Sequence, residues 1–353
     1  MEKVNTIDLS IIILSYKSKK HLEVLLPSIF ESRGTEFVQF SSLVREGKSR
    51  SETEGPESSG GNPSVPIFDA KNGGISPQKG KELHSAYTAE VIVVDNGSND
   101  GTYEWLYNLN YGRNLSYTIR SIKNQNTGFA NGNNIGIKQS SGKYILLLNA
   151  DTRVQPETFK IMLDFMEQRA DVGMATCKLV KPDGSLDLAA RRNFPNPWNS
   201  FLRLSRLEKL FSNGTTKSYN ITDTDPDQEM EIESLVGAFL LTRKSLLDKI
   251  GLLDEDFFMY GEDLDWCWRC KEAGFKVWYY PKTTVVHYKG ESSKQIPFKA
   301  LKWFHDAMWI FYKKHYSQKY PFFFNWLVWL GIYGRLTALS AINFFKSKPV
   351  VSK

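Results

Sequence analysis

The chain has 353 residues, of which 41% are hydrophobic and 13% aromatic, so it can build one large domain or two ordinary ones. Its net charge of +6 is modest, and the sequence contains neither a basic stripe nor a base-reading motif, which argues against nucleic acid as a partner. Three cysteines are too few for a disulfide framework, and the CxxC of Cys267 and Cys270 has no second pair at zinc-ligand spacing. The first sixteen residues carry no cleavage site for a signal peptide, so we expect a cytoplasmic protein.

Strands and helices are predicted to alternate over the first half of the chain. Residues 9–14 (LSIIIL) predict a buried parallel strand, and the apolar positions after Ser18 follow the 3.6-residue period of a helix that Pro27 should kink. Residues 34–89 are rich in Ser, Gly, Glu and Pro and lack periodicity, which predicts a disordered low-complexity insertion. Further strands are expected at 90–94, 117–122 and 144–148, with helices at 102–109 and 128–139.

The second half continues this alternation and then changes character. Helices are predicted at 156–169, 243–250 and 263–273, strands at 172–176, 234–241 and 277–286, and a loop-rich stretch at 182–230. This order predicts an α/β fold with a doubly wound sheet in a domain of residues 1–295.

The tail of residues 296–353 is aromatic and basic, and we expect it to be helical. Its apolar stretch, residues 321–334 (PFFFNWLVWLGIYG), is shorter than the roughly 20 residues that span a bilayer. Aromatic and apolar residues flanked by Lys313, Lys314, Lys319 and Arg335 are typical of a helix that lies in the membrane interface. We therefore expect peripheral contact with the inner face of the cell membrane; the alternative is a core-packing or dimer helix.

Polar residues follow four predicted strands at their carboxyl ends. They are Ser15 and Tyr16, Asp95 and Asn96, residues 124–134, and residues 149–151. In open α/β sheets ligands bind at this edge, and oxygen ligands there suit a divalent cation that holds a diphosphate. An Asx-type turn before Pro156 is the alternative for the last of these. The dinucleotide-binding GxGxxG is missing from the sequence, as is a P-loop of correct spacing.

Five motifs in fixed order carry a resemblance to a known family. They are VVDNGSNDGT (93–102), NQNTGFANGNNIGI (124–137), LLLNADT (146–152), VGAFLLTRKSLLDKIGLLDEDFFMYGEDLDWCWR (236–269) and HYKGES (287–292). Together they resemble a family 2 glycosyltransferase of the GT-A fold, in the rhamnosyltransferase-like and galactofuranosyltransferase-like branch, over roughly residues 7–295 apart from the insertion.

The resemblance implies a Rossmann-like, mostly parallel central sheet flanked by helices. It also implies transfer of a sugar, with inversion, from a nucleotide-diphosphate donor to a hydroxyl of a glycan or lipid-linked acceptor in cell-surface polysaccharide synthesis. The branch suggests rhamnose from a dTDP donor.

The resemblance assigns donor-binding roles to residues at the strand ends. Asp95 matches the carboxylate that binds the nucleotide base, and Ser15 and Tyr16 line the same pocket. The segment that approaches the ribose and the diphosphate contains Asn124, Gly128 and Asn134, and the other nucleotide-binding positions are Asn96 and Asn149.

The resemblance also assigns a metal site and a catalytic base. Asp151 matches the last Asp of the DxD metal motif and His287 a second ligand for Mg²⁺ or Mn²⁺, whereas Asn149 stands where the family often has Asp. Asp263 in YGEDLDW matches the base that takes the proton of the acceptor's hydroxyl. Its neighbours Glu262 and Asp265 compete for the role, and three acids that merely start a helix are the structural alternative.

Two other functions stay open at the level of the sequence. A non-catalytic module that binds nucleotide sugars or glycans would be expected to lose the metal and base residues together, yet Asp151, Asp263 and His287 are all present. A nucleotidyltransferase shares an α/β core, but the sequence near the first strand lacks a Gly-rich Arg/Lys motif.

Overall fold

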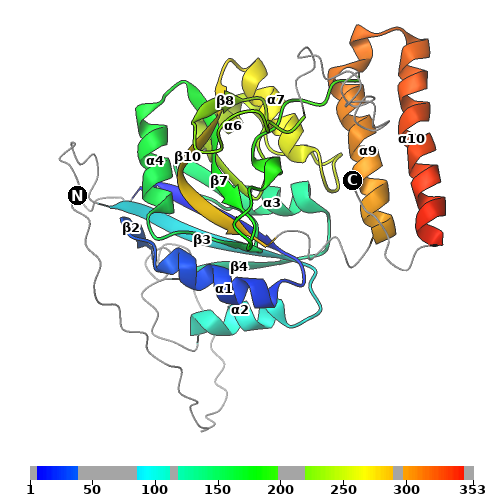
Figure 1. The fold of residues 1–353 in the computed structure, drawn as a ribbon. Helices are drawn as coiled ribbons and strands as arrows, with labels where there is room; N and C mark the ends of the chain where they lie inside the picture. Colours follow the sequence, from blue (N-terminus) through cyan, green and yellow to red (C-terminus); the bar gives the residue numbers. More distant parts are fainter. Residues whose placement is uncertain (1–5, 39–85, 112–117, 198–218, 289–296, 346–353) are drawn as a thin grey trace.

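The computed structural model describes residues 6–38, 86–111, 118–197, 219–288 and 297–345. One ten-stranded sheet forms the centre of the domain, with helices on both of its faces (Figure 1). The predicted α/β class is therefore confirmed.

Four parallel strands form the first half of the sheet. They lie side by side in the order β4 (Ile119–Asn124), β3 (Tyr87–Asn96), β1 (Leu9–Ser15) and β5 (Tyr144–Leu148). Their register places Ser15 opposite Asp95, and Asn96 opposite Asn124. The polar strand ends predicted from the sequence therefore do meet at one edge.

The predicted insertion is shorter than residues 34–89. A short strand, β2 (Thr35–Phe37), pairs in parallel with the first residues of β3, which itself begins at Tyr87. The remainder of the predicted insertion, residues 39–85, lies outside the described residues.

The second half of the sheet is mixed. β9 (Phe239–Arg243) runs antiparallel between β5 and β7 (Val172–Val180), and β7 pairs in parallel with β10 (Lys276–His287). The short strands β6 (Thr152–Arg153) and β8 (Met230–Ile232) pair antiparallel with β10. The doubly wound pattern therefore holds for the first half only, and the strand predicted at 234–241 begins five residues late, at Phe239.

Six helices predicted before the tail are present at or near their expected positions. α1 and α2 lie below the sheet and α4 above it in the view of Figure 1. α4 buries Phe159, Met162 and Met166 at helical spacing, which is the apolar stripe that a surface helix turns toward its core. The bounds are α1 (Lys19–Phe30), α2 (Thr102–Tyr111), α3 (Phe129–Lys138), α4 (Thr158–Gln168), α6 (Lys244–Ile250) and α7 (Glu262–Glu272), with a 3₁₀ turn η3 (Leu188–Ala190) inside the loop-rich stretch.

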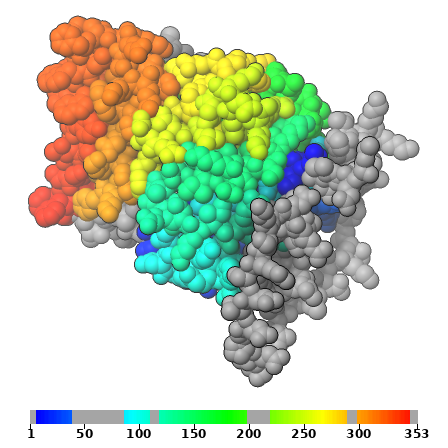
Figure 2. All heavy atoms as spheres, turned by 180° about the vertical axis from the view of Figure 1, so that it is seen from behind, coloured from blue at the N-terminus to red at the C-terminus, as the bar shows by residue number. Residues whose placement is uncertain are grey.

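The C-terminal tail is a helical hairpin of α9 (Pro297–His315), η5 (Ser317–Lys319) and α10 (Phe322–Phe344). α9 lies between α10 and the rest of the domain in both views (Figures 1 and 2). A second hydrophobic cluster, made by Phe257, Leu264, Ala307 and Phe311, joins α9 to α7 and the loop before it. α9 therefore shares a core with the α/β domain.

The predicted length of the last apolar helix is wrong. α10 has 23 residues and continues through Arg335, where the sequence suggested an interruption. Arg335 is tolerated because its guanidinium reaches Nε2 of buried His305 on α9, at 2.8 Å. Among the described residues, α10 is the helix long and apolar enough to cross a membrane on length and composition.

Candidate active site

Ser15 and Asp95 lie side by side at the ends of β1 and β3. Both side chains are fully buried, and Ser15 Oγ has no partner of hydrogen-bond geometry among the described residues. Burial raises the pKa of Asp95, and hydrogen bonds from Ser98 offset part of this effect. Because buried polar atoms are almost always paired, the ends of these two strands are a candidate site for a polar ligand.

A hydrogen bond joins the loops that follow β1 and β3. The backbone N–H of Lys17 donates to Ser98 Oγ at 2.8 Å, which links the loop after β1 to the loop after β3. Lys17 has a positive φ of 52°, an uncommon backbone conformation for a residue other than glycine. Tyr16 is half-buried beside it, with Nζ of Lys17 5.5 Å from the centre of its ring.

Asn96 and Asn124 shape the loop that leads into α3. Asn96 Nδ2 donates to the carbonyl of Gly128 at 3.1 Å, and its Oδ1 accepts from Asn124 Nδ2 at 3.0 Å. Gly128 has a φ of +93°, and a Cβ there would lie 2.5 Å from the carbonyl oxygen of Phe258. The structure thus brings all three residues together at the ends of β3 and β4, where their contacts support the loop.

Asn134 connects α3 to the loop before α7. Its Nδ2 donates to the carbonyl of Leu253 at 2.8 Å and to Glu255 Oε1 at 2.9 Å, and its Oδ1 accepts from the N–H of Leu253 at 3.1 Å. Because Asn134 makes these three contacts and is only 1% exposed, it holds α3 against the loop before α7. Its assignment to nucleotide binding stays a prediction.

Asp151 and His287 are brought together by the pairing of β6 with β10. His287 Nε2 lies 3.4 Å from Asp151 Oδ1, and His287 Nδ1 lies 2.9 Å from Asp187 Oδ2. Burial opposes a charge on His287, but the two carboxylates raise its pKa to about 9. Burial likewise acts to raise the pKa of Asp151, and the hydrogen bond and charge of His287 outweigh it and lower that pKa.

This donor set fits a divalent cation that shares its coordination with a substrate. Among the described residues, no group of three His, Cys, Asp or Glu side chains converges as a complete metal site. Two protein ligands suffice where a diphosphate and water fill the remaining positions, as Mg²⁺ sites commonly do. A histidine whose far nitrogen is held by a carboxylate, as Asp187 holds His287, is the usual arrangement of a metal-ligating histidine.

Asn149 and Asp263 lie on either side of one short segment before β9. The N–H of Asn149 donates to the carbonyl of Ala238 at 3.1 Å, and the N–H of Gly237 donates to Asp263 Oδ2 at 3.2 Å. These two hydrogen bonds therefore connect the end of β5 to the start of α7 through residues 237–238. Asn149 is half-buried, and its side-chain amide forms no hydrogen bond with another described residue.

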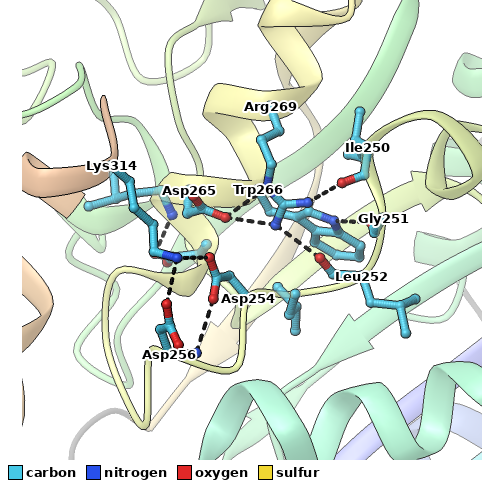
Figure 3. Close-up of polar contacts among 12 residues, drawn as sticks. Ile250, Gly251, Leu252, Asp254, Asp256, Asp265, Trp266, Arg269 and Lys314 are labelled. Atoms are coloured by element: carbon cyan, nitrogen blue, oxygen red, sulfur yellow. Dashed lines mark hydrogen bonds and ion pairs between the residues drawn. The ribbon is translucent and has the colours of Figure 1, made fainter. Parts of the chain in front are cut away.

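The three acids at the start of α7 have different surroundings. Asp265 is buried and fully engaged: its Oδ2 accepts from Arg269 Nε at 2.8 Å, and its Oδ1 lies 2.8 Å from His315 Nε2. Burial would raise the pKa of Asp265, yet these partners lower it. Figure 3 shows that Arg269 in turn reaches the carbonyls of Ile250 and Leu252, so Asp265 belongs to a structural network.

Glu262 and Asp263 differ in their partners. Burial and the negative charge of Asp263 raise the pKa of Glu262 to about 8. Asp263 instead has a countercharge, because Arg192 Nη2 lies 2.7 Å from its Oδ2. Neighbouring carboxyl groups with different surroundings are characteristic of acid–base sites.

A strained turn presents these acids. Tyr260 has a φ of +70° and Gly261 one of +84°, directly before Glu262. Positive φ is an outlier for a bulky residue, and such strain is concentrated at functional sites.

The sequence alone did not reveal Asp187, Arg192 or Glu255. Each acts through a partner about 70 to 120 residues away: His287, Asp263 and Asn134. In the sequence, Arg192 is marked by its place in an Arg-Arg pair within a predicted loop. Asp187 is marked by its place before a short apolar run. Neither pattern is specific.

The fold and the site define a class. A mixed sheet with helices on both faces and polar residues at the carboxyl ends of its parallel strands has the architecture of the GT-A glycosyltransferase fold. The solved structure of GalNAc-T7 with UDP, GalNAc and Mn²⁺ matches this fold with a TM-score of 0.50 at 13% identity, over 90% of this chain and 52% of that chain. The chain thus spans about half the length of that structure.

The family follows from sequence comparison. Residues 81–251 match the sequence model of Glycosyl transferase family 2, so the chain carries a domain of this family. It is 26% identical over 256 residues to N-acetylglucosaminyl-diphospho-decaprenol L-rhamnosyltransferase of Mycobacterium tuberculosis, which covers 64% of this chain and 75% of the relative. It is also 26% identical over 183 residues to the rhamnosyltransferase WbbL of Escherichia coli K12, which covers 50% and 66%.

Proposed function

We propose that this protein is an inverting glycosyltransferase that moves a sugar, rhamnose in the first instance, from a nucleotide-diphosphate donor to a hydroxyl of a lipid-linked or glycan acceptor. The observation that carries the proposal is the chain of contacts from Asn149 through residues 237–238 to Asp263, which joins the end of β5, beside the proposed metal ligand Asp151, to the proposed base. Release of nucleoside diphosphate only when donor and acceptor are both present would support it. Donor binding without release would indicate a non-catalytic module instead.

The buried hydroxyl of Ser15 and the buried carboxylate of Asp95 suit a pyrimidine base. Uracil and thymine present an imide N–H between two carbonyls, so a carboxylate can accept the N–H while a hydroxyl donates to a carbonyl. A pyrimidine donor agrees with the rhamnosyltransferase relatives. Thermal shift with a panel of nucleoside diphosphates tests this: dTDP or UDP should stabilise the protein more than GDP or ADP, and Asp95→Asn should remove the preference.

A divalent cation, Mg²⁺ or Mn²⁺, would be held by Asp151 and His287, with Asp187 orienting the histidine. Bound there, it would supply the positive charge that neutralises the leaving diphosphate. Asp151→Ala should abolish transfer and weaken donor binding, whereas Asn149→Ala should do less because an amide brings no charge. Full activity in excess EDTA would refute a metal-dependent reaction.

Asp263 is the proposed base because it is the acid of the three that has both a cationic partner, Arg192, and an oxygen, Oδ1, with a hydrogen-bond position left. The acceptor's hydroxyl oxygen attacks the anomeric carbon, its proton passes to Asp263, and the bond to the diphosphate breaks on the opposite side. This single displacement inverts the anomeric centre, whereas retention by double displacement would need a nucleophilic group. The anomeric configuration of the product, read by NMR, decides between them.

The outer face of α10 is the proposed site of membrane contact. Phe322 is 85% exposed, Trp326 59% and Leu327 53%, which is too much apolar surface for a helix that meets only water. Among the basic residues expected to help, Lys314 is paired with Asp254 and Asp256, and Arg335 is engaged by His305. We therefore expect apolar burial to contribute more than charge.

A hairpin that lies on the membrane agrees better with the contacts of α10 than one that crosses it. Tyr333 donates to Asp306 at 3.1 Å, and Tyr312 donates to Asn325 at 2.5 Å, so α10 is joined to α9 by polar contacts along its length. α9 carries many charged side chains and cannot follow α10 into hydrocarbon, so crossing would break these contacts. The relatives' part in lipid-linked glycan synthesis agrees with an enzyme at the inner face of the cell membrane.

Vesicle flotation tests this membrane contact. The full chain should float with vesicles that contain anionic phospholipid at low salt, and the double variant Phe323→Glu, Trp326→Glu should not. Val24→Glu, which places the same charge at an exposed apolar position of α1, is the control. Flotation of the double variant equal to that of the control would refute contact through α10.

A further inference from the structure

Arg192 is held in place from both its backbone and its side chain. Its N–H donates to the carbonyl of Ser234 at 3.0 Å, and its carbonyl accepts from the N–H of Ser234 at 2.9 Å. The guanidinium is buried; it donates to the carbonyl of Leu235 through Nη2 and lies 3.3 Å from the hydroxyl of Tyr219 through Nη1. The same Nη2 donates to Asp263 Oδ2 at 2.7 Å. Arg192 is thus a rigid donor aimed at one oxygen of the proposed base.

The two oxygens of Asp263 are unequally occupied. Oδ2 accepts from Arg192 and from the N–H of Gly237, and Oδ1 accepts from the N–H of Leu264 at 2.8 Å. A carboxylate has about four positions for hydrogen bonds, two on each oxygen. The remaining position therefore lies on Oδ1, while Oδ2 serves as an anchor.

Arg191 shows that the contact is particular to one of two adjacent arginines. Its guanidinium lies 5.1 Å from the ring of Tyr279 and donates to Thr224 Oγ1 and the carbonyl of Asp225, both at 3.1 Å. The backbone at Arg191 is extended, so successive side chains point in opposite directions. Only Arg192 of the pair contacts Asp263.

Among the described residues, Arg192 is the cation that forms an ion pair with Asp263. The titratable groups that face this pair are Glu262, Asp265 and Cys267 from α7 and Tyr219 from the loop-rich stretch, and Asp265 is already paired with Arg269. A buried carboxylate that loses its partner takes up a proton in preference to remaining charged. Removing Arg192 would therefore leave a buried carboxyl group beside Glu262 without its cation.

We propose that Arg192 is a positioning residue for the transfer reaction: it anchors Oδ2 of Asp263 and balances the charge of the carboxylate, so that Oδ1 is left to receive the proton of the acceptor's hydroxyl. The proposal rests on the function proposed above, in which Asp263 is the base. It gives the loop-rich stretch a part in positioning the base, beside the part that Asp187 of the same stretch has in orienting His287.

The test compares Arg192→Met with Arg191→Met, two variants with the same chemical change one residue apart. Arg192→Met should lower kcat on the order of 10²-fold, the cost typical of a misplaced catalytic group, while KM for the donor changes little. The acidic limb of its kcat–pH profile should move to higher pH, because Asp263 then protonates more readily. Arg191→Met should lose thermal stability and keep the profile of the parent protein.

Arg192→Lys keeps the charge and covers the case in which Arg192→Met fails to fold. It should regain part of kcat and return the acidic limb toward that of the parent protein. An unmoved profile in both Arg192 variants overturns the positioning role. Asp263→Asn separates this failure from a failure of the proposed function: if it keeps its transfer rate, the assigned base is wrong; if it is inactive while both Arg192 profiles stay unmoved, only the role of Arg192 is wrong.

Discussion

Replacing Asp187 with Asn should weaken metal binding although Asp187 does not touch the metal position. Its Oδ2 lies 2.9 Å from His287 Nδ1, its Oδ1 accepts from the N–H of Ala189 at 3.1 Å, and it is 1% exposed. Asn has the same shape and can keep the bond to Ala189. The amide that replaces Oδ2 presents either a neutral oxygen or a donor to Nδ1, so the ring of His287 loses its charged anchor.

The expected magnitude follows from measured losses of such orienting carboxylates, which cost about 10- to 100-fold in metal affinity or activity. This corresponds to about 1.4 to 2.7 kcal/mol, since each tenfold change is worth about 1.4 kcal/mol. The site here depends on two protein ligands, so misorienting one of them should place the loss at the upper end of the range.

Calorimetric or EPR titration of Mn²⁺ in the presence of a nucleoside diphosphate measures this loss directly. Asp183→Asn is the matched control: Asp183 also accepts a backbone N–H two residues on, from Ser185 at 2.9 Å, but it is exposed and lies apart from His287. The control should bind Mn²⁺ like the parent protein. Equal Mn²⁺ affinity in Asp187→Asn and the parent would refute the role given to Asp187, and so would equal losses in both variants.

Three further predictions concern the base, the donor loop and the insertion. Asp263→Asn should bind donor normally in thermal shift yet lose transfer by about 10² to 10⁴, and a loss that appears in Glu262→Gln instead would mean the wrong acid is assigned. Gly128→Ala should lower both Tm and donor affinity by more than Gly101→Ala, because both have positive φ but only the Cβ at 128 would meet backbone, at 2.5 Å. Replacing residues 40–84 with a Gly/Ser linker of about six residues, long enough to return from the end of β2 to the start of β3, should leave donor binding near normal; loss of the fold would show that the segment is structural.

The sequence by itself determined the local elements and the edge at which they place polar groups. The strand of residues 144–148 and the helix after Ser18 were predictable because burial imposes an apolar period that depends only on neighbouring residues. Asp95 and Asp151 were found in the same way, since each directly follows a buried run. The parallel order of the first four strands then followed from the alternation with helices.

The apolar patterns of the sequence did not predict the direction of β9 or the length of α10. An apolar run looks the same whether its strand runs parallel or antiparallel, and β9 runs antiparallel because it enters the sheet between β5 and β7. Arg335 suggested the end of a helix, but its contact with His305 lets α10 continue.

Only the tertiary structure shows that three neighbouring acids have different partners. Glu262, Asp263 and Asp265 lie within four residues and are equivalent as sequence, yet the first is buried without a countercharge and the last is held by Arg269 and His315. Asp263 differs because Arg192, 71 residues away, reaches one of its oxygens. The charge state of a buried group depends on the field of everything packed around it, and that field is assembled only when distant segments meet in the fold.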